Sequence, residues 1–256
     1  MLKQFFLNTP ATLRMNSNKF GINHLPVYLL AFSAIMLFAC TANPITIETA
    51  MPTATPRFLA LGDSYTIGES VDPSERWPVQ LAAAIRADGV LLDDPTIIAQ
   101  TGWTTSNLLA QIEASKPQGP FDLVTLLIGV NNQYQGKEIE SYLEEFGKLL
   151  DISIALAGGD PGRVVVLSIP DWSVTPFAEG RERDRIRSQI NQFNLVNQTE
   201  SLAAGAHYVD ITPISRQAAE DSSLLAADNL HPSGKMYAAW VALLRPTISE
   251  ILQPEG

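Results

Sequence analysis

The chain has 256 residues, of which 46% are hydrophobic and 17% charged, so it can bury the core of one globular domain with little room for a second. Its net charge is −10, and the part after the first forty residues carries −13, with 14 basic and 27 acidic side chains. Such a surface repels nucleic acid and anionic membranes, which excludes charge-driven binding to either. The single cysteine, Cys40, excludes an intrachain disulfide, and Cys/His zinc spacing is absent.

The first segment has the layout of a secretory signal. Residues 25–39 form an apolar run that is shorter than the roughly 20 residues a membrane-spanning helix needs. Basic residues precede the run, and a small residue, Ala39, stands at its end. We therefore expect residues 1–39 to be a signal peptide.

The cysteine directly after this run indicates how the mature chain is held. Residues 37–40, Leu-Phe-Ala-Cys, resemble the box of bacterial lipoproteins, in which the cysteine becomes the lipidated first residue after cleavage. A buried structural cysteine, or an ordinary signal cleaved elsewhere, is the alternative. Residues 40–56 are rich in Thr, Ala and Pro and predict a flexible linker. The resemblance implies an extracytoplasmic protein, lipid-anchored at Cys40 to a bacterial cell membrane.

Residues 57–256 alternate between predicted strands and predicted helices. Apolar runs predict five strands, at residues 58–61, 95–99, 121–128, 163–169 and 207–210. Apolar residues at helical spacing, with capping signals, predict helices at residues 77–86, 108–114, 137–157, from 181 onward, and 236–252. This alternation favours a parallel sheet covered on both faces, which is a three-layer α/β/α domain.

Glycines and polar residues follow three of the predicted strands. Gly-Asp-Ser at residues 62–64 follows the first strand, Gly102 the second, and Gly129 to Asn131 the third. Because the carboxyl ends of parallel strands lie at one edge of a sheet, we expect these residues to be neighbours. A helical turn after Ser64 would point backbone N–H groups at the serine and favour negative charge there. Taken alone, this serine fits a turn residue that only caps a helix equally well.

A base for this serine comes from near the end of the chain. Beyond the predicted signal there are two histidines, His207 in a predicted strand and His231 in a loop. A serine hydroxyl needs a nearby base to become nucleophilic, and histidine is the usual one. Asp228 precedes His231 by three residues, so it can reach one ring nitrogen, fix the tautomer and stabilise the imidazolium. We therefore interpret Ser64, His231 and Asp228 as a catalytic triad and His207 as a strand-edge residue.

These segments together resemble the blocks of the SGNH hydrolases, also called the GDSL esterase/lipase family. The four residues for which the family is named match Ser64, Gly102, Asn131 and His231. The resemblance implies a flavodoxin-like fold with Ser64 as nucleophile, His231 as base and Asp228 as the residue that orients His231. It also implies an oxyanion hole formed by the backbone N–H groups of Ser64 and Gly102 with the side-chain amide of Asn131.

The resemblance covers nearly the whole predicted domain and departs from the family at one position. The third block usually reads Gly-x-Asn-Asp, whereas this chain has Asn132 in the last place. Because that acid is not a triad member, we expect catalysis to persist while hydrogen bonding in the loop differs. Aromatic residues near the proposed site, for which pocket wall and simple packing are both open, are Trp103, Tyr134 and Trp172.

The sequence thus predicts a serine esterase, a carboxylic ester hydrolase that cleaves acyl or acetyl esters through an acyl-enzyme intermediate. This chemistry needs no metal or organic cofactor, and the expected substrates are small-molecule, lipid or glycan esters. One alternative is a surface-anchored binding protein of the same fold without turnover, which the presence of the whole residue set argues against. Another is a nucleotide-binding domain, but residues 62–68 do not read Gly-x-Gly-x-x-Gly and no Walker-type lysine follows.

Overall fold

A computed structural model describes residues 54–253. Five parallel strands form one sheet in the order β2-β1-β3-β4-β5. The strands are β1 (Phe58–Gly62), β2 (Thr96–Ala99), β3 (Leu123–Leu127), β4 (Val164–Leu167) and β5 (His207–Val209). The predicted five-stranded parallel sheet is confirmed, and its order is that of the flavodoxin-like folds.

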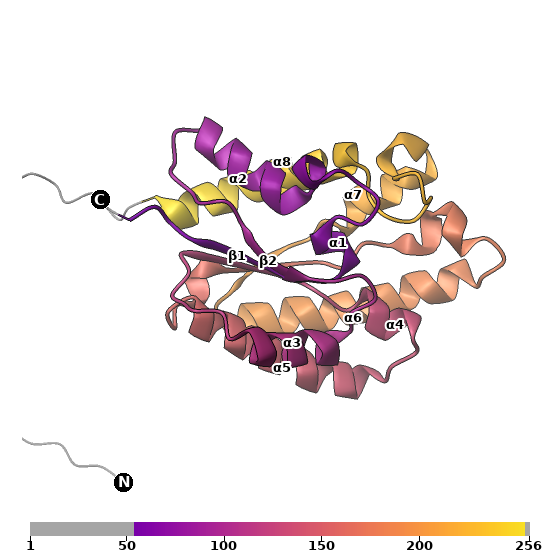
Figure 1. Cartoon of the computed structure of the whole chain (residues 1–256). Coiled ribbons are helices and arrows are strands. Elements are labelled where there is room, and N and C mark those ends of the chain that lie inside the picture. The colour runs from indigo at the N-terminus through magenta and orange to yellow at the C-terminus, as the bar shows by residue number, and fades with distance from the viewer. Residues whose placement is uncertain (1–53, 254–256) are drawn as a thin grey trace, which may run out of the picture. The chain divides into compact units, whose positions relative to one another are not determined.

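Helices cover the sheet in two layers (Figure 1). The helices α2 (Trp77–Ala87) and α8 (Gly234–Leu252) cover one face, and α3 (Thr105–Ser115), α5 (Ile139–Leu156) and α6 (Arg183–Ala203) cover the other. Shorter helices follow β1, β3 and β5, namely α1 (Ser64–Ile67), α4 (Val130–Tyr134) and α7 (Thr212–Arg216). Single turns of 3-10 helix are η1 (Pro73–Glu75), η2 (Pro161–Arg163), η3 (Trp172–Val174), η4 (Pro176–Ala178), η5 (Gln217–Ala219) and η6 (Ser222–Leu224).

The three middle strands of the sheet are buried on both faces, which accounts for the continuous apolar runs in their sequences. Every residue of β1, β3 and β4 is buried, whereas the edge strands β2 and β5 are partly exposed. Strands covered on both faces have no polar side to alternate with. Burial continues past the paired residues at Phe121, Ile128 and Ile169, so the predicted third and fourth strands run longer than the observed ones.

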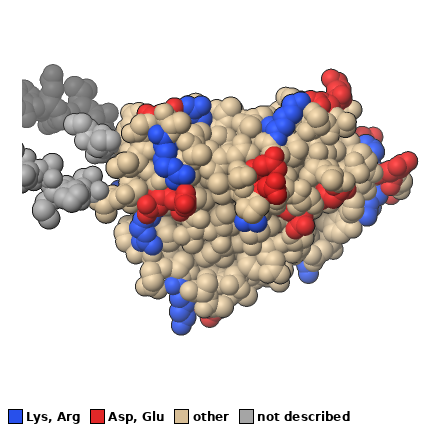
Figure 2. All heavy atoms as spheres, turned by 45° about the horizontal axis from the view of Figure 1, so that its top comes forward, with Lys and Arg blue, Asp and Glu red and all other residues tan. Residues whose placement is uncertain are grey.

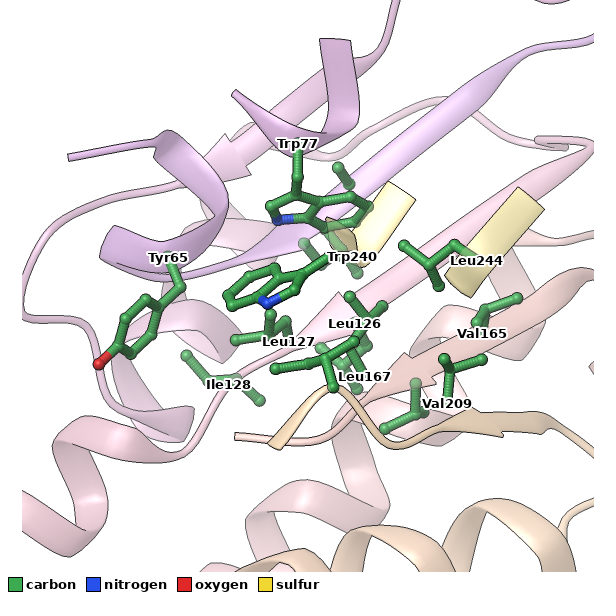
Figure 3. Close-up of a cluster of buried hydrophobic side chains, with 14 of the residues drawn as sticks. Tyr65, Trp77, Leu126, Leu127, Ile128, Val165, Leu167, Val209, Trp240 and Leu244 are labelled. Atoms are coloured by element: carbon green, nitrogen blue, oxygen red, sulfur yellow. The ribbon is translucent and has the colours of Figure 1, made fainter. Parts of the chain in front are cut away.

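The core on the α8 side is built around two fully buried tryptophans, Trp77 of α2 and Trp240 of α8. Figure 3 shows both indole rings over sheet side chains that include Leu126 and Leu127. The neighbouring Tyr237 meets Trp240 edge to face and donates its hydroxyl to the backbone carbonyl of Tyr65 at 3.0 Å. The closing helix is thereby attached to the turn that carries Ser64.

The short helices α4 and α7 and the 3-10 turns were not predicted. Each is five residues or shorter, so none has room for a repeat of apolar residues at helical spacing. None of the helices between residues 54 and 253 combines the length and the apolar character that a bilayer span requires. Figure 2 turns the α2 and α8 layer forward and shows acidic and basic side chains interspersed, without a continuous basic surface on this face.

The predicted signal peptide at residues 1–39, the lipidation site Cys40 and linker residues 41–53 lie outside the described residues. These boundaries therefore remain predictions. The described fold occupies the part of the chain assigned to the hydrolase domain, residues 57–256, up to residue 253.

Gly62, at the end of β1, has no room for a side chain. A Cβ atom there would lie 2.5 Å from the Leu127 carbonyl oxygen and against the Thr66 side chain. We expect Gly62→Ala to lower the free energy of unfolding by about 1–3 kcal/mol in urea denaturation. Gly147→Ala is the matched control, because open space surrounds Gly147 in α5, and it should raise stability by about 0.5–1 kcal/mol. Equal effects of the two changes would contradict this packing.

Candidate active site

Ser64 starts the short helix α1 directly after β1, as the Gly-Asp-Ser turn predicted. The side chain of Asp63 caps this helix by accepting the Tyr65 N–H at 3.1 Å. Gly68 ends it in the left-handed region, at φ 71°, and its N–H donates to the Ser64 carbonyl. The tight turn holds Ser64 at the carboxyl end of the strand, with only 4% of its surface exposed.

Asp63 is a structural residue of this turn, in agreement with its place before the nucleophile candidate. Complete burial raises its pKa to about 7, and N–H groups of Tyr65, Asp63 and Gly129 counteract part of that rise. One carboxyl oxygen, Oδ2, has no hydrogen-bond partner among the described residues. The group caps α1 from inside the core, where it has no path to a substrate.

Three hydrogen-bond donors lie around Ser64. Gly102 follows β2 in the left-handed region, at φ 86°, which disfavours any other residue. Within residues 54–253, neither the Ser64 N–H nor the Gly102 N–H donates to another backbone group. Asn131, in the first turn of α4, donates one amide hydrogen to the Trp103 carbonyl at 2.9 Å and has a second to offer.

The carboxylate of Asp228 holds the imidazole of His231. The Nδ1 atom of His231 lies 2.6 Å from Oδ2 of Asp228, and the same oxygen accepts the Ser70 hydroxyl at 2.7 Å. The other oxygen accepts the N–H groups of Leu230 and His231 at 3.0 and 2.9 Å. Partial burial opposes ionisation of Asp228, but the hydrogen bonds outweigh it and lower the pKa to about 2. The imidazole also packs against Tyr65, with 5.5 Å between the ring centres.

A pocket of about 180 Å³ brings these groups together. It is lined by Ser64, Tyr65, Thr101, Gly102, Val130, Asn131, Tyr134, Trp172, Phe177, Leu230 and His231. The four residues of the SGNH motif thus share one pocket, although they are spread over 168 positions from 64 to 231. Ser64 and His231 make no hydrogen bond to each other in the described structure, as is common before a substrate tightens a catalytic site.

One wall of the pocket is aromatic. Tyr134, Trp172 and Phe177 contact one another with ring centres 5.6 to 6.2 Å apart. The guanidinium of Arg181 lies 5.2 to 5.5 Å from all three ring centres and donates to the Tyr134 hydroxyl at 3.2 Å. Cation–π contact of this kind favours a fixed arrangement of the rings. Of the three aromatic candidates from the sequence, Tyr134 and Trp172 line the pocket, whereas Trp103 contributes only its carbonyl to Asn131.

A buried carboxylate, that of Asp171, anchors the segment that carries Trp172 to neighbouring helices. Asp171 has a fully buried side chain, and its Oδ2 lies 2.8 Å from Nε of Arg216 and 3.6 Å from Nε of Arg187. The indole N–H of Trp172 donates to the Gln133 side chain at 2.8 Å. The wall is therefore fixed from α4, α6 and α7.

Residues 60–239 match the family model described as the GDSL-like Lipase/Acylhydrolase family. The chain belongs to this family. The resemblance of its sequence blocks to the SGNH hydrolases is confirmed, and as a GDSL-family member the protein is a carboxylic ester hydrolase.

Solved structures similar to this GDSL-family chain share its fold. TesA is 18% identical with a TM-score of 0.60, over 77% of this chain and 99% of TesA. The lipase/acylhydrolase from Enterococcus faecalis is 23% identical with a TM-score of 0.55, over 79% and 100%. A variant of an acetyl xylan esterase from Geobacillus stearothermophilus is 16% identical with a TM-score of 0.57, over 78% and 97%. A search of curated proteins finds no match.

A larger hollow of about 770 Å³ lies at the opposite end of the sheet. It is lined by residues that precede strands, such as Asp122 and Arg163, and by His207 at the start of β5. His207 pairs there with the Gly162 carbonyl at 3.1 Å, as expected for a strand-edge histidine. Parallel sheets bind ligands at the carboxyl ends of their strands, which favours the smaller pocket as the candidate site of this GDSL-family hydrolase. Within residues 54–253, His, Cys, Asp and Glu side chains form no group of three that could hold a metal ion.

Several residues in and around the pocket of this hydrolase were not predicted from the sequence. Phe177 lines the pocket from a 3-10 turn that carries no recognisable motif, and Ser70 reaches Asp228 across 158 positions. Ser70 adopts a left-handed backbone, at φ 65°, which the sequence does not indicate either. Leu230 could have been named, because it stands between Asp228 and His231.

The lowered pKa of Asp228 predicts how stability depends on pH. A carboxyl whose pKa falls from 3.8 to about 2 on folding stabilises the fold above pH 4, and this stabilisation is lost as the pH falls through about 2. We expect Asp228→Asn to unfold at lower urea concentration near pH 6, with the difference from the native protein shrinking between pH 4 and pH 2. Asp94→Asn, at a side chain that is 85% exposed, is the control and should show little difference. A gap for Asp228→Asn that stays constant down to pH 2 would contradict the assignment.

Proposed function

We propose that this ester hydrolase is a serine esterase that works through a Ser64–His231–Asp228 triad and an acyl-enzyme intermediate. The observation that carries the proposal is the pocket itself. It holds Ser64 and His231 together, while Asp228 binds the far ring nitrogen of His231 at 2.6 Å. A histidine whose Nδ1–H is donated to a carboxylate keeps Nε2 free to accept a proton.

Catalysis then follows from the positions of these groups. Ser64 Oγ attacks the ester carbonyl carbon while Nε2 of His231 takes the hydroxyl proton, and the carbonyl π electrons move onto oxygen. The developing oxyanion accepts hydrogen bonds from the N–H groups of Ser64 and Gly102 and from the Asn131 amide. Collapse of the tetrahedral intermediate breaks the bond to the leaving alcohol, which takes the proton from His231. In the second half of the reaction, His231 takes a proton from water, and the water oxygen attacks the carbonyl carbon of the acyl-enzyme. Ser64 Oγ then leaves and takes the proton back from His231.

The pocket supports short acyl or acetyl esters as substrates. Its volume of about 180 Å³ is below the range of about 300–1,000 Å³ that drug-sized ligands occupy. Side chains that close it are mostly apolar or aromatic: Tyr65, Val130, Tyr134, Trp172, Phe177 and Leu230. A small apolar cleft beside the nucleophile suits a short acyl chain better than a long one. The fold shared with an acetyl xylan esterase agrees with this size class.

The direct test of the proposal is Ser64→Ala. We expect it to remove hydrolysis of a short-chain nitrophenyl ester and labelling by a fluorophosphonate probe, because both need the same oxygen nucleophile. Ser106→Ala, an exposed serine at the start of α3, is the control and should retain both. Full turnover by the folded Ser64→Ala variant would refute the triad. If the native protein also failed to react with the probe, the alternative of a binding protein without turnover would stand.

The same proposal includes a lipid anchor at Cys40 that holds the enzyme on the outer side of a bacterial membrane. Its support is the sequence alone: an apolar run after basic residues, ending at the single cysteine. Mass spectrometry of the protein from its native host should find Cys40 as a lipid-modified first residue. An unmodified Cys40, or an amino terminus beyond it, would rule out the anchor.

A further inference from the structure

Asn132 and Thr105 join the first turn of α4 to the first turn of α3 by two hydrogen bonds. The Thr105 N–H donates to Oδ1 of Asn132 at 3.0 Å, and Nδ2 of Asn132 donates to the Thr105 hydroxyl at 2.6 Å. Asn132 is 2% exposed and Thr105 fully buried, so water does not compete for these bonds. Backbone N–H can only donate, which fixes the orientation of the Asn132 amide.

A third residue, Glu145 of α5, completes the group. The Thr105 hydroxyl accepts from Nδ2 of Asn132 and donates to Oε2 of Glu145, because a carboxylate oxygen can only accept. The proton order is therefore set along the whole group, from amide to hydroxyl to carboxylate. We call Asn132, Thr105 and Glu145 the Thr105 clamp.

The clamp lies next to two of the proposed oxyanion donors. Asn132 directly follows Asn131, and Thr105 stands three residues after Gly102. Asn131 contacts the same segment from the other side, through its hydrogen bond to the Trp103 carbonyl at 2.9 Å. Three hydrogen bonds thus fix the first turn of α4 against residues 103–105. A shift between these segments would change the separation of the Gly102 N–H and the Asn131 amide.

We propose that the Thr105 clamp is a positioning device that sets the distance between the Gly102 N–H and the Asn131 amide, with Glu145 supplying its one negative charge. The inference rests on the proposed function, since it assigns these two donors to the oxyanion. Moving such a donor by a fraction of an ångström weakens its hydrogen bond to the transition state. The same shift weakens the binding of the substrate less, so kcat falls more than KM changes. The clamp residues touch no substrate and act through Gly102 and Asn131.

The first test removes only the Thr105 hydroxyl. Thr105→Val keeps the N–H bond to Asn132 and the shape of the side chain but breaks the links to Nδ2 of Asn132 and to Glu145. We expect kcat for a short nitrophenyl ester to fall about tenfold with little change in KM, which corresponds to a lost hydrogen bond in a buried network. Thr105→Ser retains the hydroxyl and should restore kcat to within about threefold of the native value.

A matched control comes from another buried threonine, Thr125, whose hydroxyl is not part of a hydrogen-bond network in the described part of the chain. Thr125 of β3 is fully buried, and its Oγ1 has no hydrogen-bond partner among the described residues. Thr125→Val removes the same atoms without breaking a hydrogen bond, so activity should be unchanged. An equal loss of kcat in both valine variants would show general disturbance of the core and would overturn the clamp.

The second test exchanges the charge. An aspartate at 132 offers no N–H to Thr105, so its carboxylate competes with Glu145 for the single hydroxyl proton. We expect Asn132→Asp to lower kcat about tenfold or more, and Glu145→Gln alone to change it less than threefold. In the double variant the hydroxyl donates to Asp at 132 and accepts from Gln at 145, so kcat should recover. Failure of the folded double variant to exceed Asn132→Asp would overturn the role of Glu145.

A double variant at positions 105 and 131 distinguishes a role of Thr105 in positioning the oxyanion donors from a role in stability alone. In an Asn131→Ala background one oxyanion donor is already lost, so Thr105→Val should cost less than it costs in the native enzyme. Fully additive losses would contradict action through Asn131. If esterase activity survives Ser64→Ala, the proposed function itself fails. If it depends on Ser64 but not on Thr105, only the clamp fails.

Discussion

The pairing of β1 with strands on both of its sides is the constraint on which the site depends. Gly62, the last residue of β1, lies opposite Ala99 of β2 and Leu127 of β3. The chain segments that leave these three strands therefore emerge side by side, at the point where the strand order reverses. Since each strand is held in parallel register by its ladder, Ser64, Gly102 and Asn131 need no further long-range contact to reach one edge. The imidazole of His231 is brought to that edge from the other end of the chain by α8.

The helix α4, only five residues long, organises the rest of the pocket. Its consecutive side chains serve three neighbours: Asn131 binds the Trp103 carbonyl, Asn132 binds Thr105, and Gln133 binds the indole of Trp172. One turn of helix thus fixes the segment after Gly102 on one side and the aromatic wall on the other. In the proposed mechanism this explains how a site built from loops and one short helix can be rigid. The Thr105 hydroxyl faces Nδ2 of Asn132, which donates to it, and Glu145 accepts the hydroxyl proton, so with Asn132 in place this hydroxyl is paired both as acceptor and as donor.

The sequence predicted what depends on local pattern. Apolar runs located all five strands, and the Asp228-to-His231 spacing predicted a contact between the two side chains that the structure shows at 2.6 Å. Contacts between residues far apart in the chain could not be predicted. Nothing in the sequence indicates that Ser70 reaches Asp228, or that Thr105 reaches Glu145 across 40 positions. Phe177 was not predicted for a related reason, because its turn is too short to show a helical repeat of apolar residues. Those residues become visible only when packing brings separate segments together.

The role that the proposed mechanism assigns to the groups around Ser64 is to stabilise a tetrahedral oxyanion. It is tested most directly by a crystal structure of the protein inactivated with a small alkyl fluorophosphonate, which mimics that intermediate. We expect phosphorus bonded to Ser64 Oγ, with the phosphoryl oxygen about 2.7–3.1 Å from the N–H groups of Ser64 and Gly102 and from Nδ2 of Asn131. A phosphoryl oxygen directed into solvent, or phosphorus attached to a different residue, would contradict it.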